Sequence, residues 1–152
     1  MKPVKKALLL LVCLSICYSL IACGVVTITT NEPPTLRVSH QGSEITADTG
    51  TYSWTVKKLL SGHTTFADSV NPAELVKKSA PLIVSPKSSL TLNFDRKPKT
   101  IEVSIWHKNN SEKQSLVNGK IEVPAAKGDF VYLVVGTFEQ GTVSYAFKVT
   151  VN

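Results

Sequence analysis

Apolar and polar residues alternate along most of the chain after residue 35, with the period of two that a half-buried β-strand requires. The pattern is clearest at the end, where odd positions from Val143 to Val151 are apolar and most even positions are polar. Over 130–138 both sets of positions are apolar, which predicts a central strand covered on both faces. The remaining predicted strands span residues 36–40, 52–56, 82–84, 90–94, 100–106 and 121–123.

Turn-forming residues such as glycine, proline and asparagine separate these stretches. About eight short strands with a turn every eight to twelve residues are typical of an antiparallel β-sandwich. The pattern therefore predicts an all-β fold, an Ig-like sandwich of about 7–9 strands.

One segment lacks the alternation and resembles the start of a helix. Asn71 can cap the helix, Pro72 suits its first position, and Glu74 stands at the third. We expect a short helix or bent connection over 72–78, crossing between the two sheets and ending before Pro81.

The first 22 residues have the order of an export signal. A basic stretch over 1–6 precedes an apolar stretch over 7–21. The sequence Leu20-Ile21-Ala22-Cys23 at its end resembles the lipobox of bacterial lipoproteins. This resemblance implies that the Cys23 thiol receives a diacylglyceryl group and that cleavage falls between Ala22 and Cys23. Two acyl chains anchor a protein stably, whereas one binds a membrane only marginally.

The resulting organisation is a signal peptide over 1–22, a lipidated tether over 23–34 and a sandwich domain over 35–152. The domain would then face the outside of a bacterial cell membrane. An uncleaved transmembrane anchor is the alternative, because the apolar span continues to residue 26 and reaches about 20 residues, enough to cross a bilayer. Both interpretations export residues 27–152.

Cysteine and charge exclude several functions. Cys13 and Cys17 lie in the signal peptide and Cys23 is the lipidation site, so the mature chain keeps no free thiol for catalysis, zinc binding or redox chemistry. Three of the 17 basic residues also belong to the signal peptide, which leaves 14 against 11 acidic residues, a net charge of +3. That charge is too small to indicate nucleic-acid binding, and no cofactor is expected.

Short motifs follow one another in a fixed order after residue 50: Gly50-Thr51-Tyr52-Ser53-Trp54, Ala67-Asp68, Pro72, Pro86, Leu92-Asn93-Phe94, Pro98, Val123-Pro124, Lys127-Gly128, Tyr132 and Tyr145-Ala146-Phe147. Together they resemble the small extracytoplasmic Ig-like domains of Firmicute lipoproteins. The resemblance implies the fold and the exported location, and it implies no enzymatic activity. Some such domains have a pair of cysteines where this chain has Ser53 and Phe66, so that disulfide is absent here.

Trp106 is the first candidate for a binding surface. Within 100–108, Ile101, Val103 and Ile105 occupy one face of the predicted strand and Trp106 occupies the other. If these apolar residues face the core, Trp106 faces solvent beside Glu102 and Lys108. A Trp among charged neighbours is typical of a binding hot spot. The alternative is that a loop or the segment 72–78 covers it. Trp54, by contrast, is expected in the core.

The second candidate surface is the stretch 61–70, which we interpret as a long polar loop. It contains His63, Phe66 and Asp68. Functional residues are frequent on such loops.

Evidence for an enzyme or a metal site is weak in this sequence. His40, His63 and His107 have no spacing typical of metal ligands, and no GxSxG motif accompanies the serines. We therefore expect a non-enzymatic binding module whose partner is an envelope protein, a wall polymer or a peptide. The alternatives are a structural or regulatory lipoprotein that positions a membrane enzyme, and an extracytoplasmic hydrolase, which would require a concave pocket with convergent polar groups.

Overall fold

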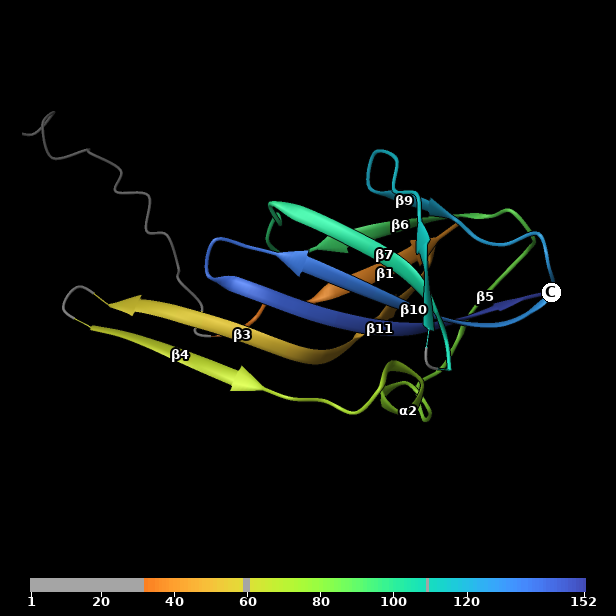
Figure 1. Ribbon diagram of the computed structural model, residues 1–152. Coiled ribbons are helices and arrows are strands. Elements are labelled where there is room, and N and C mark those ends of the chain that lie inside the picture. Colours follow the sequence, from red (N-terminus) through yellow and green to blue (C-terminus); the bar gives the residue numbers. More distant parts are fainter. Residues whose placement is uncertain (1–31, 59–60, 109) are drawn as a thin grey trace, which may run out of the picture.

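The computed structural model describes residues 32–58, 61–108 and 110–152 (Figure 1). The predicted signal peptide, Cys23 and most of the predicted tether lie outside these residues. Within the described part, no helix has both the length and the apolar character needed to cross a membrane.

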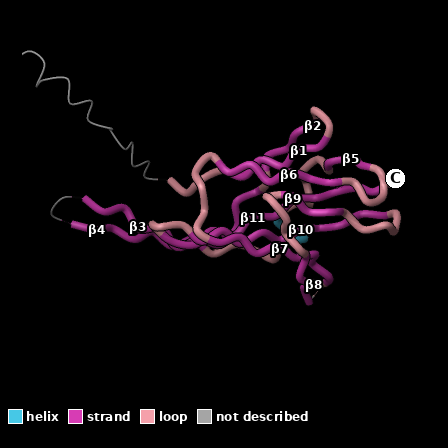
Figure 2. Tube along the Cα trace, turned by 90° about the horizontal axis from the view of Figure 1, so that it is seen from above, coloured by secondary structure: helices cyan, strands magenta, loops and turns pink. Residues whose placement is uncertain are grey.

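Two β-sheets pack face to face, so the predicted all-β, Ig-like sandwich is confirmed (Figures 1 and 2). The four-stranded sheet has the order β2 (Ser43–Thr46), β1 (Leu36–His40), β6 (Ser89–Phe94), β9 (Lys120–Glu122). The seven-stranded sheet has the order β4 (Ser61–Ala67), β3 (Asp48–Lys58), β11 (Gly141–Val151), β10 (Gly128–Thr137), β7 (Thr100–His107), β8 (Asn110–Gln114). The short strand β5 (Leu82–Val84) joins the second sheet by pairing in parallel with β11.

Three of the strands were not predicted, and all three lie at sheet edges. They are β2, β4 and β8, and most of their residues are exposed. An edge strand with polar residues on both faces has no apolar alternation, so its sequence does not differ from that of a loop. The predicted loop over 61–70 is therefore wrong for its first seven residues, which form β4.

Aromatic side chains dominate the core between the sheets. Trp54, Tyr132, Tyr145 and Phe147 are its largest fully buried residues, which confirms the core position of Trp54. Tyr132 stacks on Phe147 with a centroid distance of 5.1 Å, and Phe138 meets the Trp54 ring edge to face at 5.7 Å. Each such pair contributes about 0.5–1.5 kcal/mol beyond the burial of its area.

The helix α2 (Pro72–Leu75) forms where it was predicted, because Asn71 caps it. The Asn71 side chain accepts a hydrogen bond from the Glu74 backbone N–H at 3.0 Å. However, α2 does not cross between the sheets as expected. It lies on the outer face of the seven-stranded sheet and contacts β11, β10 and β3, so the connection from β4 to β5 stays with one sheet.

The chain enters the domain through a segment that side chains hold firmly. The buried Tyr145 hydroxyl donates to the Pro34 carbonyl at 2.7 Å, and the Thr35 N–H donates to Asp95 at 3.0 Å. The Arg96 guanidinium donates to the Glu32 carbonyl. Residues 32–34, assigned to the tether above, are therefore attached to the sandwich. They lie at the end of the molecule from which the β3–β4 hairpin projects (Figures 1 and 2).

Candidate binding recess on the outer sheet face

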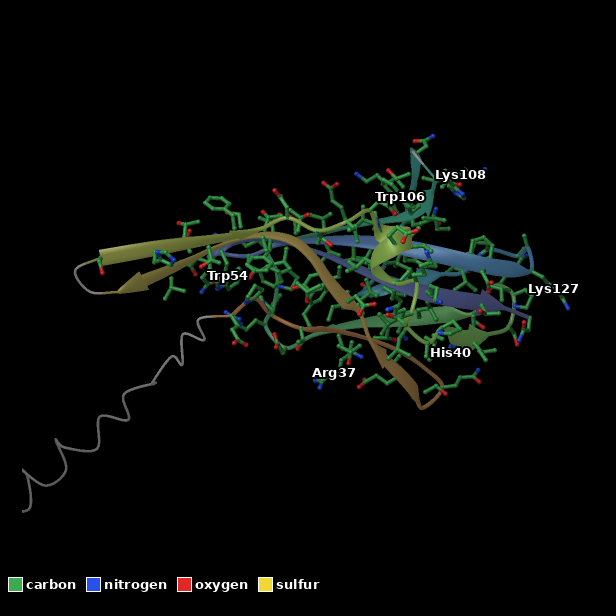
Figure 3. The ribbon with its side chains drawn as sticks, turned by 90° about the horizontal axis from the view of Figure 1, so that it is seen from below. Arg37, His40, Trp54, Trp106, Lys108 and Lys127 are labelled. Carbon is green, nitrogen blue, oxygen red and sulfur yellow. The ribbon has the colours of Figure 1, made fainter. Side chains whose placement is uncertain are left out.

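Strand β7 presents alternate residues to the two faces of its sheet, as its sequence predicts. Val103 and Ile105 are buried in the core, whereas Trp106 and Glu102 project from the outer face. Figure 3 shows Trp106 on the side of the sandwich that carries α2.

Trp106 is not an open surface residue, because the segment around α2 lies beside it. Its side chain is half-buried. This agrees with the alternative in which the segment 72–78 covers Trp106. Between the segment and the sheet remains a recess of about 190 Å³. Its apolar walls are Trp106, Leu133, Val135 and Ala146 from the sheet, with Val70, Pro72 and Leu75 from the covering segment.

The indole N–H of Trp106 is shielded from solvent and has no hydrogen-bond partner among the described residues. A buried donor without an acceptor costs about 1–3 kcal/mol. The indole ring thus forms part of the wall of the recess, while its N–H lies unsatisfied at a position that solvent does not reach.

Glu102 and Lys108, which the sequence predicts beside Trp106, do not line the recess itself. Glu102 lies on the same outer face and is exposed. Lys108 is exposed in the turn after β7, where its backbone has a φ of 49°. The recess thus has an apolar interior and charged residues on the same strand and turn, the arrangement that surrounds many binding hot spots.

The residues of the second candidate surface do not join this recess. Phe66 is 74% exposed and faces outward opposite Ser53, but His63 lies opposite Val56 and so faces the other side of the sheet. Asp68 is exposed just after β4. Strand β4 is four positions from β7 in the sheet order, which separates them by about 19 Å. The two surfaces are therefore distinct.

The sequence reasoning missed the sheet side of the recess, although a signal was present. Leu133 and Val135 belong to the strand with two apolar faces, and that pattern correctly predicted a cover. The pattern does not show how much of this apolar area the covering segment hides. A four-residue helix is too short to cover all of it. The unfilled part is the recess.

The structure also places the residues considered for catalysis. Among the described residues no hydrogen bond joins His63 to Asp68, and no group of three or more His, Cys, Asp or Glu side chains could hold a metal ion. His40 instead contacts the Ser89 carbonyl at 3.0 Å, and His107 lies 3.5 Å from Glu112 at an exposed edge.

No family model, curated protein or solved structure matches this chain.

Proposed function

We propose that this protein is a lipid-anchored binding module of the bacterial cell envelope, which holds one apolar side chain of a partner polypeptide in the recess beside Trp106. The observation that carries the proposal is an apolar recess between α2 and the outer sheet face, with Trp106 as one of its walls.

The size of the recess favours a side chain over a larger ligand. Pockets for drug-sized molecules and cofactors measure about 300–1,000 Å³, whereas a cavity of about 150 Å³ holds benzene. At about 190 Å³, the recess accommodates a ring or a branched aliphatic group.

One orientation of the domain at the membrane suits both the proposed anchor and the recess. Eight residues separate Cys23 from Glu32, a reach of at most about 30 Å. The hydrogen bonds to residues 32–35 fix the end of the domain nearest the anchor. Trp106, which forms one wall of the recess, lies on the outer face of the sheet and away from that entry segment (Figure 3), where an envelope protein can reach it.

Selection of displayed peptides on the detergent-extracted full chain tests the binding site. We expect enriched peptides to share one aromatic or branched aliphatic residue, and we expect Trp106→Ala to weaken their binding by about tenfold or more, the effect of losing a hot-spot anchor. Phe66→Ala is the matched control, because it removes an exposed aromatic residue from the same sheet face. Equal binding by the two variants would rule out the recess.

The anchor has its own test, the intact mass of the protein from the membrane fraction. The proposal predicts a chain that begins at Cys23 and carries a diacylglyceryl group. Cys23→Ser should abolish the modification. A chain that retains residue 1 in untreated cells would show that the anchor is of another kind.

A further inference from the structure

Among the residues that the structure describes, none pairs with the outer edge of β4. Its seven residues, Ser61–Ala67, pair with β3 along one side only, and most are exposed. The backbone N–H and C=O groups along the other side are therefore free to pair with another strand.

Natural proteins protect sheet edges with charges or by keeping the edge strand short, and the other edges here follow that rule. Charged residues stand on β2 (Glu44), β8 (Glu112 and Lys113) and β9 (Lys120 and Glu122), and β5 has three residues. Strand β4 is the longest of these edges and contains no Lys, Arg, Asp or Glu. Its edge is thus suited to pairing.

We propose that β4 pairs antiparallel with β4 of a second copy of this chain, about a two-fold axis that passes between the two Thr64 residues. This pairing joins the two seven-stranded sheets into one continuous sheet. It places Phe66 opposite Gly62 of the second copy and Thr64 opposite its counterpart.

The residues of β4 complement one another in this register. Phe66 is 74% exposed, and a side chain added at Gly62 would meet no atom closer than 3.9 Å, so the space above that glycine is open. An aromatic ring that covers a glycine on the neighbouring strand is a known stabilising pair. Facing threonines also pair favourably, and no like charges oppose each other. Strand β4 therefore supplies both halves of its own interface.

The position of the chain entry supports a second copy as the occupant. The Arg96 guanidinium holds the Glu32 carbonyl and lies 4.9 Å from the centre of the Trp54 ring. Trp54 belongs to β3, the strand that pairs with β4, so the entry segment is held on the core-facing side of the sheet, near the strand next to β4.

A two-fold axis perpendicular to the sheet leaves the two entry segments on the same face of the joined sheet. Both tethers then extend toward one membrane. This last step rests on the proposed lipid anchor, whereas the pairing itself does not.

Disulfide formation at the two-fold axis tests the pairing in native membranes. Facing residues of antiparallel strands have Cα atoms about 4.5–5.5 Å apart, within the range of a disulfide. Full-length Thr64→Cys should therefore form a disulfide-linked dimer under mild oxidation. In the matched control Ala67→Cys, on the same strand, the two thiols would be offset by six positions, about 20 Å. We expect its dimer yield to be lower by about tenfold or more.

Equal dimer yields from the two cysteine variants, or no dimer from either, would overturn the proposal. So would cross-linking of Thr64→Cys to a different protein, since that would identify a foreign strand as the occupant. As a second test, Thr64→Lys places two like charges at the axis and should make the detergent-extracted protein monomeric by sedimentation. Trp106→Ala should leave the dimer intact, so failure of the recess and failure of the pairing give different results.

Discussion

Two buried tyrosines differ in one respect that a pair of substitutions can measure. Tyr132 and Tyr145 are both fully buried in the core. The Tyr145 hydroxyl donates to the Pro34 carbonyl at 2.7 Å, while the Tyr132 hydroxyl has no partner among the described residues. Replacement by Phe removes a hydrogen bond in one case and an unsatisfied polar group in the other.

The expected effects have opposite directions. Tyr145→Phe leaves the carbonyl of the buried Pro34 without its donor, which costs about 1–3 kcal/mol. Tyr132→Phe removes a hydroxyl that was desolvated without compensation, so the free energy of unfolding should stay unchanged or rise by about 1 kcal/mol. The two variants should therefore differ by about 1–4 kcal/mol in the free energy of unfolding.

Urea unfolding of the chain from residue 24 onward, followed by tryptophan fluorescence, measures this difference. Trp54 is a suitable probe because it is buried beside Arg96 and the entry segment. With a typical slope of about 2 kcal/mol per molar urea, the midpoints should differ by about 0.5–2 M. If Tyr145→Phe were as stable as Tyr132→Phe, the hydrogen bond to Pro34 would not hold the entry segment, and the reasoning would fail.

Two further predictions concern glycine substitutions and the stability of the fold at alkaline pH. Gly141→Ala should destabilise the protein by at least about 3 kcal/mol, because the new Cβ would lie 1.9 Å from the Ser53 carbonyl oxygen at a φ of 155°. Gly119→Ala, at a φ of 73° with open space around it, should cost only about 1 kcal/mol. Thermal melts of the two variants measure the contrast. Burial raises the pKa of Tyr132 from 10.0 to about 12, so the unfolded chain loses its proton first. Stability should therefore hold below pH 10 and fall above it, with Tyr132 contributing a loss of about 3 kcal/mol by pH 12. Burial also raises the pKa of Tyr145, which adds to this loss. A pH series of urea midpoints in which Tyr132→Phe shows the same loss as the parent would contradict this assignment.

The predictability of the fold follows the burial of each strand. Strands with one buried face, such as β1 and β11, have apolar residues at every second position, and their positions were predicted almost to the residue. The edge strands β2, β4 and β8 bury little apolar area. Their backbones are fixed by hydrogen bonds to a neighbouring strand, and such pairing depends on chain topology rather than on local pattern.

The candidate site could be predicted only in part for a related reason. The period of two placed Trp106 on the outer face, and the capping residue Asn71 located the helix. The recess itself depends on how closely the segment 70–75 approaches β10 and β11, which is a tertiary property of residues far apart in the sequence. Likewise, the sequence grouped Phe66 with His63, whereas the strand pairing of β4 directs their side chains to opposite faces.

The measurement that tests the binding recess most directly is an NMR titration of the two indole N–H signals with p-cresol as a probe. Trp106 forms a wall of the recess, while Trp54 is enclosed in the core on the other face of the same sheet. The recess predicts a saturable shift of the Trp106 indole signal and a constant Trp54 signal. If neither signal moved, or if both moved alike and without saturation, the outer face would have no such site and the proposed function would be wrong.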